Sequence, residues 1–179
     1  MKALRPLVAL PCMLVACCVP PAPEPTPSPP VQRAPAQTPP PPPPPSAPPA
    51  NWMDAAQTTG DWSWRQTSGG SQALFGAPGM APVLVLQCSR AQSQVLVVRS
   101  GAATAPVPMR ILTESQTKTV SAAPDNGGKS SLVAAISARD PILDAMAISK
   151  GRFAVETGGQ STIYVPSWPE VTRVIEDCR

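Results

Sequence analysis

Carboxylates and hydroxyls are the side chains best suited to catalysis in this chain, because the chain contains no histidine. Without histidine it has no usual general base at neutral pH, no Ser-His-Asp triad and no ordinary zinc site. Asp140 and Asp144 are one helical turn apart, and we interpret them as a helix cap and a solvent-exposed residue. The sequence therefore indicates no catalytic residue, no metal ligand and no cofactor-binding residue.

Serine chemistry has little support in the sequence. No nucleophile-elbow motif Gly-x-Ser-x-Gly surrounds any of the candidate serines, which are Ser68, Ser71, Ser130 and Ser131. A catalytic Ser–Lys dyad that uses Lys129 is still possible, so a small Ser or Asp cell-wall hydrolase is one functional alternative.

Residues 123–130 fit a loose Walker A pattern, but only a weak strand precedes them and no apolar run ending in aspartate follows. We interpret their Asn-Gly-Gly as a hairpin turn and expect no nucleotide.

Three tryptophans, Trp62, Trp64 and Trp168, offer aromatic surface for a ligand groove. The whole chain has only two phenylalanines and one tyrosine, so we favour a role in core or cap packing for the three tryptophans.

Residues 51–179 carry 11 Lys and Arg against 10 Asp and Glu, a net charge of +1. This near-neutral charge gives no electrostatic basis for binding nucleic acid.

The chain begins with a basic, apolar leader followed by a proline-rich stretch. Lys2 and Arg5 precede an apolar run over residues 7–16, which is too short to span a bilayer as a helix. Residues 18–49 contain 17 prolines, which predict an extended polyproline II spacer rather than a packed core. At roughly 3.1 Å per residue, this spacer reaches on the order of 100 Å.

The junction between leader and spacer resembles the lipobox of bacterial lipoproteins, in the sequence Leu14-Val15-Ala16-Cys17. The resemblance implies that residues 1–16 are a signal peptide and that Cys17 carries the lipid, with Cys18 as a weaker alternative acceptor. Residue 18 is not aspartate, and the sorting rule of this family then implies the outer membrane. Residues 17–50 become the lipidated cysteine and its spacer, and residues 51–179 become a single periplasmic domain.

Cys88 and Cys178 are the only cysteines in that domain. In an oxidising envelope compartment an even number of cysteines indicates a disulfide. The bridge would close a loop of about 90 residues and attach the C-terminus to a strand. Two separate thiols, or a bridge between two chains, are the alternatives.

Apolar periodicity predicts most of the secondary structure of the domain. Two of the expected strands, 83–88 and 94–99, are apolar on both faces, so we expect neighbouring buried strands of a sandwich joined by the turn 89–93. Residues 130–137 fit a strand or a helix. The other expected strands are 61–66, 71–75, 109–113, 117–120, 153–156 and 162–165.

Two short helices complete the prediction. Asp140-Pro141 starts one helix, with aspartate as cap and proline at the first position, and Gly151 ends it. Ser167 and Glu170 have capping-box spacing at the start of a C-terminal helix whose apolar face includes Cys178. We therefore expect a mostly β fold, an antiparallel sandwich-like sheet with two short helices, with α+β as the alternative.

The order of these features resembles uncharacterised lipoproteins of alphaproteobacteria and, more loosely, VasI-type accessory proteins of type VI secretion. The features are a strand with Trp62 and Trp64, an apolar strand ending at Cys88, the strand 109–111 and a terminal helix closing on Cys178. Neither group implies a catalytic residue. We expect a membrane-anchored, non-enzymatic binding or scaffolding domain that contacts envelope proteins or the cell wall, with a secretion-machine accessory protein as the alternative.

Overall fold

The computed structural model describes residues 51–125, 127 and 130–179. The predicted signal peptide, the lipid-attachment residue Cys17, its alternative Cys18 and the proline-rich spacer lie outside the described residues. Among the residues that are described, no helix is long and apolar enough to cross a membrane.

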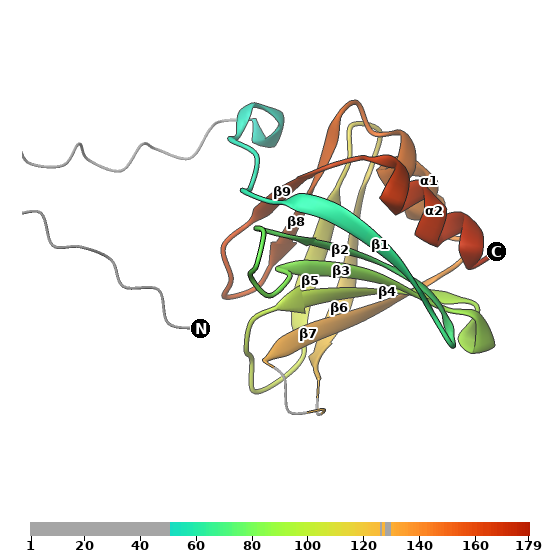
Figure 1. The fold of residues 1–179 in the computed structure, drawn as a ribbon. Coiled ribbons are helices and arrows are strands. Elements are labelled where there is room, and N and C mark those ends of the chain that lie inside the picture. The colour runs from blue at the N-terminus through green and yellow to red at the C-terminus, as the bar shows by residue number, and fades with distance from the viewer. Residues whose placement is uncertain (1–50, 126, 128–129) are drawn as a thin grey trace, which may run out of the picture. The chain divides into compact units, whose positions relative to one another are not determined.

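Strands dominate the described part of the chain (Figure 1). A short 3-10 helix, η1 (Trp52–Asp54), comes first, and a second, η2 (Arg90–Gln92), joins two strands. The α-helices are α1 (Pro141–Ile148) and α2 (Pro169–Asp177). The strands are β1 (Asp61–Thr67), β2 (Gly70–Gly76), β3 (Leu84–Ser89), β4 (Gln94–Ser100), β5 (Val107–Leu112), β6 (Thr117–Pro124), β7 (Ser131–Ser137), β8 (Arg152–Thr157) and β9 (Ile163–Pro166).

These strands form one sheet, in the order β1-β2-β3-β4-β7-β6-β5-β8-β9, with every neighbouring pair antiparallel. The sheet curls at β6, where residues 117–122 pair with β5 while Ala123 and Pro124 pair with β7. One layer therefore contains β1 to β4 with β7, and the other contains β5, β8 and β9 (Figure 1). The mostly antiparallel β fold with two helices, one of them C-terminal, is confirmed, and its two layers belong to one continuous sheet.

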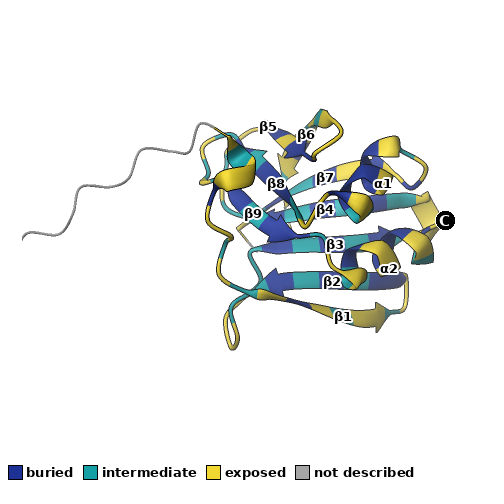
Figure 2. Ribbon diagram, turned by 90° about the horizontal axis from the view of Figure 1, so that it is seen from above, coloured by how far each residue is buried: buried dark blue, intermediate teal, exposed yellow. Residues whose placement is uncertain are grey.

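The core fills the space between the layers and beneath the helices. Its largest fully buried side chains come from both layers and from both helices, and they include Phe75, Leu86, Ile111, Phe153 and Ile175. Helix α2 contacts β1, β2, β3 and α1, and in Figure 2 both helices lie over the same face of the first layer. This inner face is the one to which alternate residues of each strand point.

The two ends of the curled sheet are tied together by the residues around the start of β1. The Thr58 N–H donates to the Tyr164 carbonyl at 2.9 Å, and the Tyr164 N–H donates to the Thr58 hydroxyl at 2.9 Å. The indole N–H of Trp62 donates to the Pro166 carbonyl at 2.8 Å. The otherwise open edge of β9 is thereby covered, which protects it against pairing with another chain.

Helix α1 starts as the sequence predicts but ends early. Asp140 is its N-cap, and its Oδ1 atom accepts a hydrogen bond from the Ile142 N–H at 3.1 Å. The helix ends at Ile148, so the predicted end at Gly151 is wrong by three residues. Gly151 has a φ of 77° and forms the left-handed turn that leads into β8.

The capping box predicted at the start of α2 is wrong. Trp168 is the N-cap and makes no side-chain capping bond, while the hydroxyl of Ser167 is buried without a hydrogen-bond partner in the described residues. The Ser167 N–H donates to the Gly151 carbonyl at 3.2 Å. This bond extends the β8–β9 pairing by one step and holds Ser167 one residue before the cap position.

Two strand predictions are resolved by the pairing of the sheet. Residues 131–137 form strand β7, which pairs with β4 along its whole length, so the helical alternative for this stretch is wrong. The expectation that β3 and β4 are buried on both faces is also wrong. Their outward side chains are only half-buried, as the alternation of dark blue and teal along these strands shows in Figure 2.

Candidate binding groove

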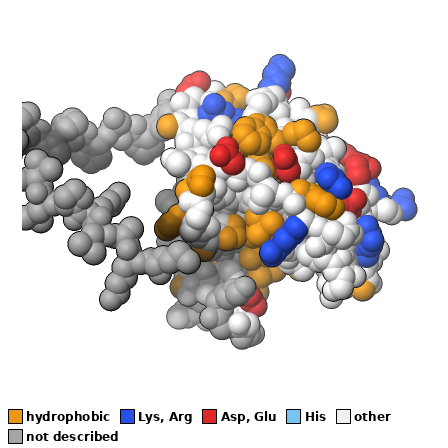
Figure 3. Space-filling view, in the orientation of Figure 1, with side chains coloured by type: hydrophobic (Ala, Val, Ile, Leu, Met, Phe, Trp, Pro, Cys, Tyr) orange, Lys and Arg blue, Asp and Glu red, His pale blue; other side chains and the backbone are white. Residues whose placement is uncertain are grey.

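The outer face of the first layer carries a groove of about 720 Å³. The outer face is the side of β1, β2, β3, β4 and β7 that points away from the core and the two helices. Figure 3 shows hydrophobic side chains gathered on this side of the molecule, beside a Lys or Arg side chain. The groove is lined by Arg65, Gln72, Leu74, Ala81, Pro82, Val85, Gln87, Leu96, Val98, Ser100, Asp125, Ser130, Ser131 and Val133.

An apolar row crosses the middle of the groove. The strand register places Leu74 beside Val85, Val85 beside Val98, and Val98 beside Val133. All four side chains are half-buried, and Leu96 adds a fifth next to the row. Cross-strand neighbours of this kind lie about 4.5–5.5 Å apart at Cβ, so the row forms a continuous apolar strip over four strands.

A polar ladder runs parallel to the apolar row, two residues further along the strands, from the β1 margin of the groove to β3. Arg65 donates to the Gln72 side-chain oxygen from Nε at 2.9 Å and from Nη2 at 2.7 Å. The Gln72 amide then donates to the Gln87 side-chain oxygen at 2.7 Å. The ladder fixes the three side chains across β1, β2 and β3 and leaves the guanidinium charge at this margin of the groove.

The opposite margin of the groove is acidic. Asp125 follows β6, and its carboxylate accepts bonds from the Gly127 N–H at 3.1 Å and from the Ser131 hydroxyl at 3.3 Å. The bond from Gly127 is the geometry of an Asx turn, and the bond from Ser131 holds Asp125 against the start of β7. The groove therefore has an apolar floor between a positive margin and a negative margin, which suits an elongated, largely apolar partner.

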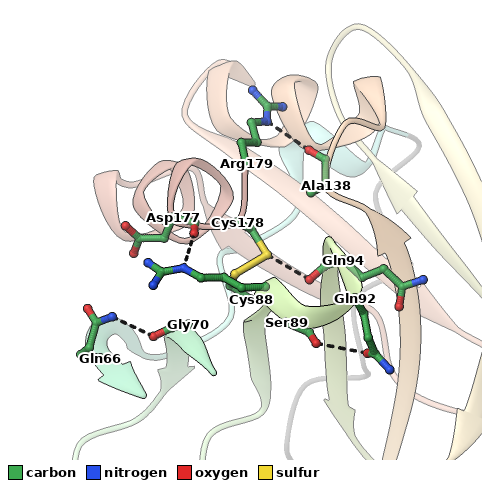
Figure 4. The surroundings of a disulfide bond; sticks show 11 residues. Gln66, Gly70, Cys88, Ser89, Gln92, Gln94, Ala138, Asp177, Cys178 and Arg179 are labelled. Atoms are coloured by element: carbon green, nitrogen blue, oxygen red, sulfur yellow. Dashed lines mark hydrogen bonds between the residues drawn. A yellow bond between two sulfur atoms is a disulfide. The ribbon is translucent and has the colours of Figure 1, made fainter. Parts of the chain in front are cut away.

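The two cysteines singled out by the sequence are brought together. Cys88 at the end of β3 and Cys178 at the C-cap of α2 form a disulfide, with their Cα atoms 5.2 Å apart (Figure 4). Arg90 Nε also donates to the Asp177 carbonyl at 2.9 Å, and Arg179 Nε donates to the Ala138 carbonyl at 3.0 Å. The end of α2 is therefore attached to the sheet by three independent links, all on the side of the sheet opposite to the groove.

The tryptophans do not line the groove. Trp62 is buried and packs against Phe75 with ring centroids 5.2 Å apart. Trp64 is half-buried beneath the guanidinium of Arg173, which lies 3.4 Å from the ring centroid. Trp168 caps α2 with 40% of its surface exposed. The packing role that the sequence favours is confirmed for Trp62 and Trp64, whereas Trp168 is exposed at the N-cap position.

Asp140 and Asp144, the two carboxylates considered for catalysis, each form a separate ion pair. Asp144 is exposed and pairs with Arg179 at 2.6 Å. Asp140 pairs with Lys118 at 2.7 Å besides capping α1. Partial burial acts to raise the pKa of Asp140, but the hydrogen bond and charge of Lys118 and the Ile142 N–H outweigh it and lower the pKa below its usual value.

The candidate serines are dispersed. Ser68 lies exposed in the turn after β1, and Ser71 is buried with a hydroxyl that has no partner among the described residues. Ser130 and Ser131 lie at the acidic margin of the groove. The Walker-like residues 123–130 are followed by strand β7 rather than by the helix that a P-loop requires, while Asn126, Gly128 and Lys129 lie outside the described residues.

Two features of the structure were missed at the level of sequence. Arg99 is buried, and burial lowers the pKa of its guanidinium, which is held by the carbonyl oxygens of Val83, Ser100 and Ser161. The groove is the second feature, and its signal was the apolar character of β3 and β4 on both faces.

Within the described residues, no three metal-ligating side chains gather closely enough to hold a metal ion.

Known proteins give no further guidance on this site. Comparison of the chain with protein-family models, with curated proteins and with solved structures found no match. The groove is therefore interpreted from its own residues and geometry.

Proposed function

We propose that this protein is a lipoprotein of the bacterial outer membrane whose periplasmic domain binds a partner, without catalysis, through the outer-face groove. The observation that carries this proposal is the apolar row Leu74–Val85–Val98–Val133, which stands half-buried on a sheet face that no described element covers. Apolar side chains gathered in this way on one face of a soluble domain are typical of an interaction surface.

The membrane attachment in this proposal is supported by the sequence. Leu14 to Cys17 has the residue types of a lipobox, and the spacer after it supplies reach on the order of 100 Å. Lipidation at Cys17 with several acyl chains gives a lasting anchor, because each buried CH₂ contributes roughly 0.8 kcal/mol. The resemblance to lipoproteins of alphaproteobacteria agrees with this architecture.

Binding is favoured over catalysis by what the polar groups of the groove already do. The Arg65, Gln72 and Gln87 side chains are engaged with one another, and the Asp125 carboxylate holds its own turn. The Ser131 hydroxyl donates to the same carboxylate at 3.3 Å as part of this turn. Side chains arranged in this way orient a partner and set its specificity.

The experiment that tests binding is photo-crosslinking in intact cells. A photoreactive residue is placed at Val85, Val98 or Val133 in the groove, one position per variant. The matched control is Thr119, an exposed residue of β6 that is not part of the groove lining. Each adduct is purified under denaturing conditions, and both its components and the linked residues are identified by mass spectrometry.

We expect all three groove positions to give the same identified adduct and Thr119 to give none. An adduct with a component of a secretion machine would identify the protein as an accessory part of that machine. The proposal is contradicted when the groove positions remain unlinked, or when Thr119 gives the same adducts.

A further inference from the structure

We propose that the free edge of strand β1 binds an extended, acidic segment of a second polypeptide, which pairs with β1 as a further strand of the sheet. This edge is a binding surface separate from the apolar row of the groove, and the proposed groove function does not depend on it. Arg65 is the only residue of β1 that also lines the groove.

Strand β1 stands at one end of the sheet and pairs only with β2. The Val83 N–H donates to the Phe75 carbonyl at 2.8 Å, so the backbone groups of Phe75 point from β2 toward β3. Its partner in β1 is Trp62, whose backbone groups therefore point away from β2. Since bonded and non-bonded pairs alternate along an antiparallel ladder, Trp64 and Gln66 also direct their N–H and C=O groups to the free edge.

The open part of this edge begins at Trp64. Trp62 is buried where its indole N–H reaches the Pro166 carbonyl beside β9. Further along, Trp64 is half-buried and Gln66 is exposed, and within the described residues no hydrogen bond reaches the backbone groups that these two direct outward. In Figure 2, β1 forms the border of the sheet. Another extended chain is the ligand that satisfies donors and acceptors spaced in this way.

Strand β1 also lacks the features that usually protect an edge strand. The strand at the other end of the sheet, β9, has four residues, ends at Pro166 and is covered by bonds from Thr58 and Trp62. Strand β1 has seven residues, contains neither proline nor lysine and pairs with β2 without a bulge. A long, regular edge of this kind is a template for strand addition.

The charge of the partner follows from Arg65, on the outer face of β1. Arg65 donates from Nε and Nη2 to the Gln72 side chain, and it forms no ion pair with any described residue. The only acidic residue of β1, β2 and β3 is Asp61, four positions away at the start of β1. Acidic side chains on the outer face of an added strand would therefore be neighbours of an unneutralised guanidinium.

The chain itself offers less suitable occupants for this edge. The spacer, residues 18–49, contains 17 prolines, and proline has no N–H to donate to a ladder. A second copy that paired β1 with β1 about Trp64 would make the two Arg65 side chains diagonal neighbours on one face, where like charges repel. A foreign acidic segment has neither disadvantage.

The test uses the end-blocked peptide Thr-Val-Glu-Val-Glu-Val-Thr and the chain from residue 17 onward, with Cys17→Ser and Cys18→Ser. Paired with β1, the valines lie opposite Trp64 and Gln66, and the glutamates lie on the face of Arg65. One matched peptide has N-methyl groups on the valines, whose N–H groups face β1, and another has them on the glutamates, whose N–H groups face away. A third peptide has lysine in place of glutamate. NMR follows the shifts and the hydrogen exchange of the Trp64 and Gln66 amides.

Variants of the protein separate the edge from the fold. Gln66→Pro removes an outward N–H and leaves the ladder with β2 intact, because that N–H does not face β2. Gln66→Ala keeps the N–H and is its matched control. Arg65→Glu reverses the charge, and Arg139→Glu makes the same change at an exposed residue between β7 and α1. Circular dichroism and thermal melting establish that every variant is folded.

We expect the acidic peptide to bind and to protect the Trp64 and Gln66 amides against exchange. Methyl groups on the glutamates, Gln66→Ala and Arg139→Glu should leave binding unchanged, whereas methyl groups on the valines and Gln66→Pro should abolish it. Arg65→Glu should weaken binding of the acidic peptide roughly threefold or more and strengthen binding of the lysine peptide. A fold defect would weaken both.

The inference is overturned if the acidic peptide fails to bind at millimolar concentration, or if valine methylation or Gln66→Pro leaves its binding unchanged. Equal binding of the lysine peptide would overturn the acidic character of the partner. Dimers of the parent chain that sediment as such and are abolished by Gln66→Pro would assign the edge to a second copy instead. The groove proposal is unaffected by these outcomes, because a strand added to β1 does not contact the apolar row.

Discussion

Removal of the Cys88–Cys178 bridge is the perturbation whose size follows most directly from the structure. The bridge joins residues 90 positions apart. Chain-entropy reasoning for a loop of that length gives about 4.6 kcal/mol of stabilisation, an upper figure because residual structure in the unfolded chain reduces it. For the 129 residues from 51 to 179 the entropy of unfolding is roughly 0.27 kcal/mol per kelvin, so the melting temperature should fall by up to about 17 °C.

The structure also predicts where the reduced protein opens first. Helix α2 keeps its buried residues Val171, Val174 and Ile175 and the bonds from Arg90 and Arg179, so the reduced protein should still fold. A helix of nine residues is marginal without its tertiary contacts, and the disulfide is the only covalent link between its end and β3. Its amides should therefore become the least protected of the core elements.

The assay compares the oxidised protein, the reduced protein and the variant Cys88→Ala/Cys178→Ala by thermal melting and amide hydrogen exchange. Reductant should lower the melting temperature of the parent and leave the double variant unchanged. Exchange over residues 169–178 should rise more than exchange in β3 and β4. The reasoning is refuted by a drop of less than about 3 °C, or by α2 amides that exchange no faster than those of β3.

Three further predictions concern the anchor, the spacer and α1. Cys17→Ser should abolish metabolic labelling with a palmitate analogue, and label equal to that of the parent would make Cys18 the acceptor. Deleting residues 20–49 should leave the melting temperature unchanged, because that stretch contributes no core, and a lower melting temperature would refute this. Asp140→Asn should destabilise the domain by about 0.5–1 kcal/mol at neutral pH through loss of the Lys118 pair. Since the folded pKa of Asp140 is lowered, that difference should persist above the unfolded pKa of about 3.9 and vanish as the pH falls through the folded pKa.

Local signals in the sequence were sufficient for most elements of the fold. Asp140 predicts the start of α1 because a cap and a proline act within one turn, and the strand positions follow from alternation over a few residues. The pairing of Cys88 with Cys178 followed from an even cysteine count and an oxidising compartment, and the structure adds their adjacency at the end of β3 and the end of α2.

The groove was beyond the sequence because burial of a strand face depends on distant elements. The curl between Ala122 and Ala123, where β6 changes partner, directs both helices and the second layer to one face of β3 and β4. No local pattern marks that position. The capping box at Ser167 failed for a related reason, since pairing with Gly151 decided the role of its backbone.

The central claim, that the outer face of the first layer is covered by a partner in the envelope, is tested most directly by oxidative footprinting. Leu74 and Leu96 report on the groove, and Met80, with 73% of its surface exposed in the β2–β3 loop, reports on reagent access. We predict that hydroxyl radicals label both leucines in the dilute purified protein and spare them in intact membranes, while Met80 is labelled in both. Equal labelling of Leu74 and Leu96 in the two samples would contradict the account.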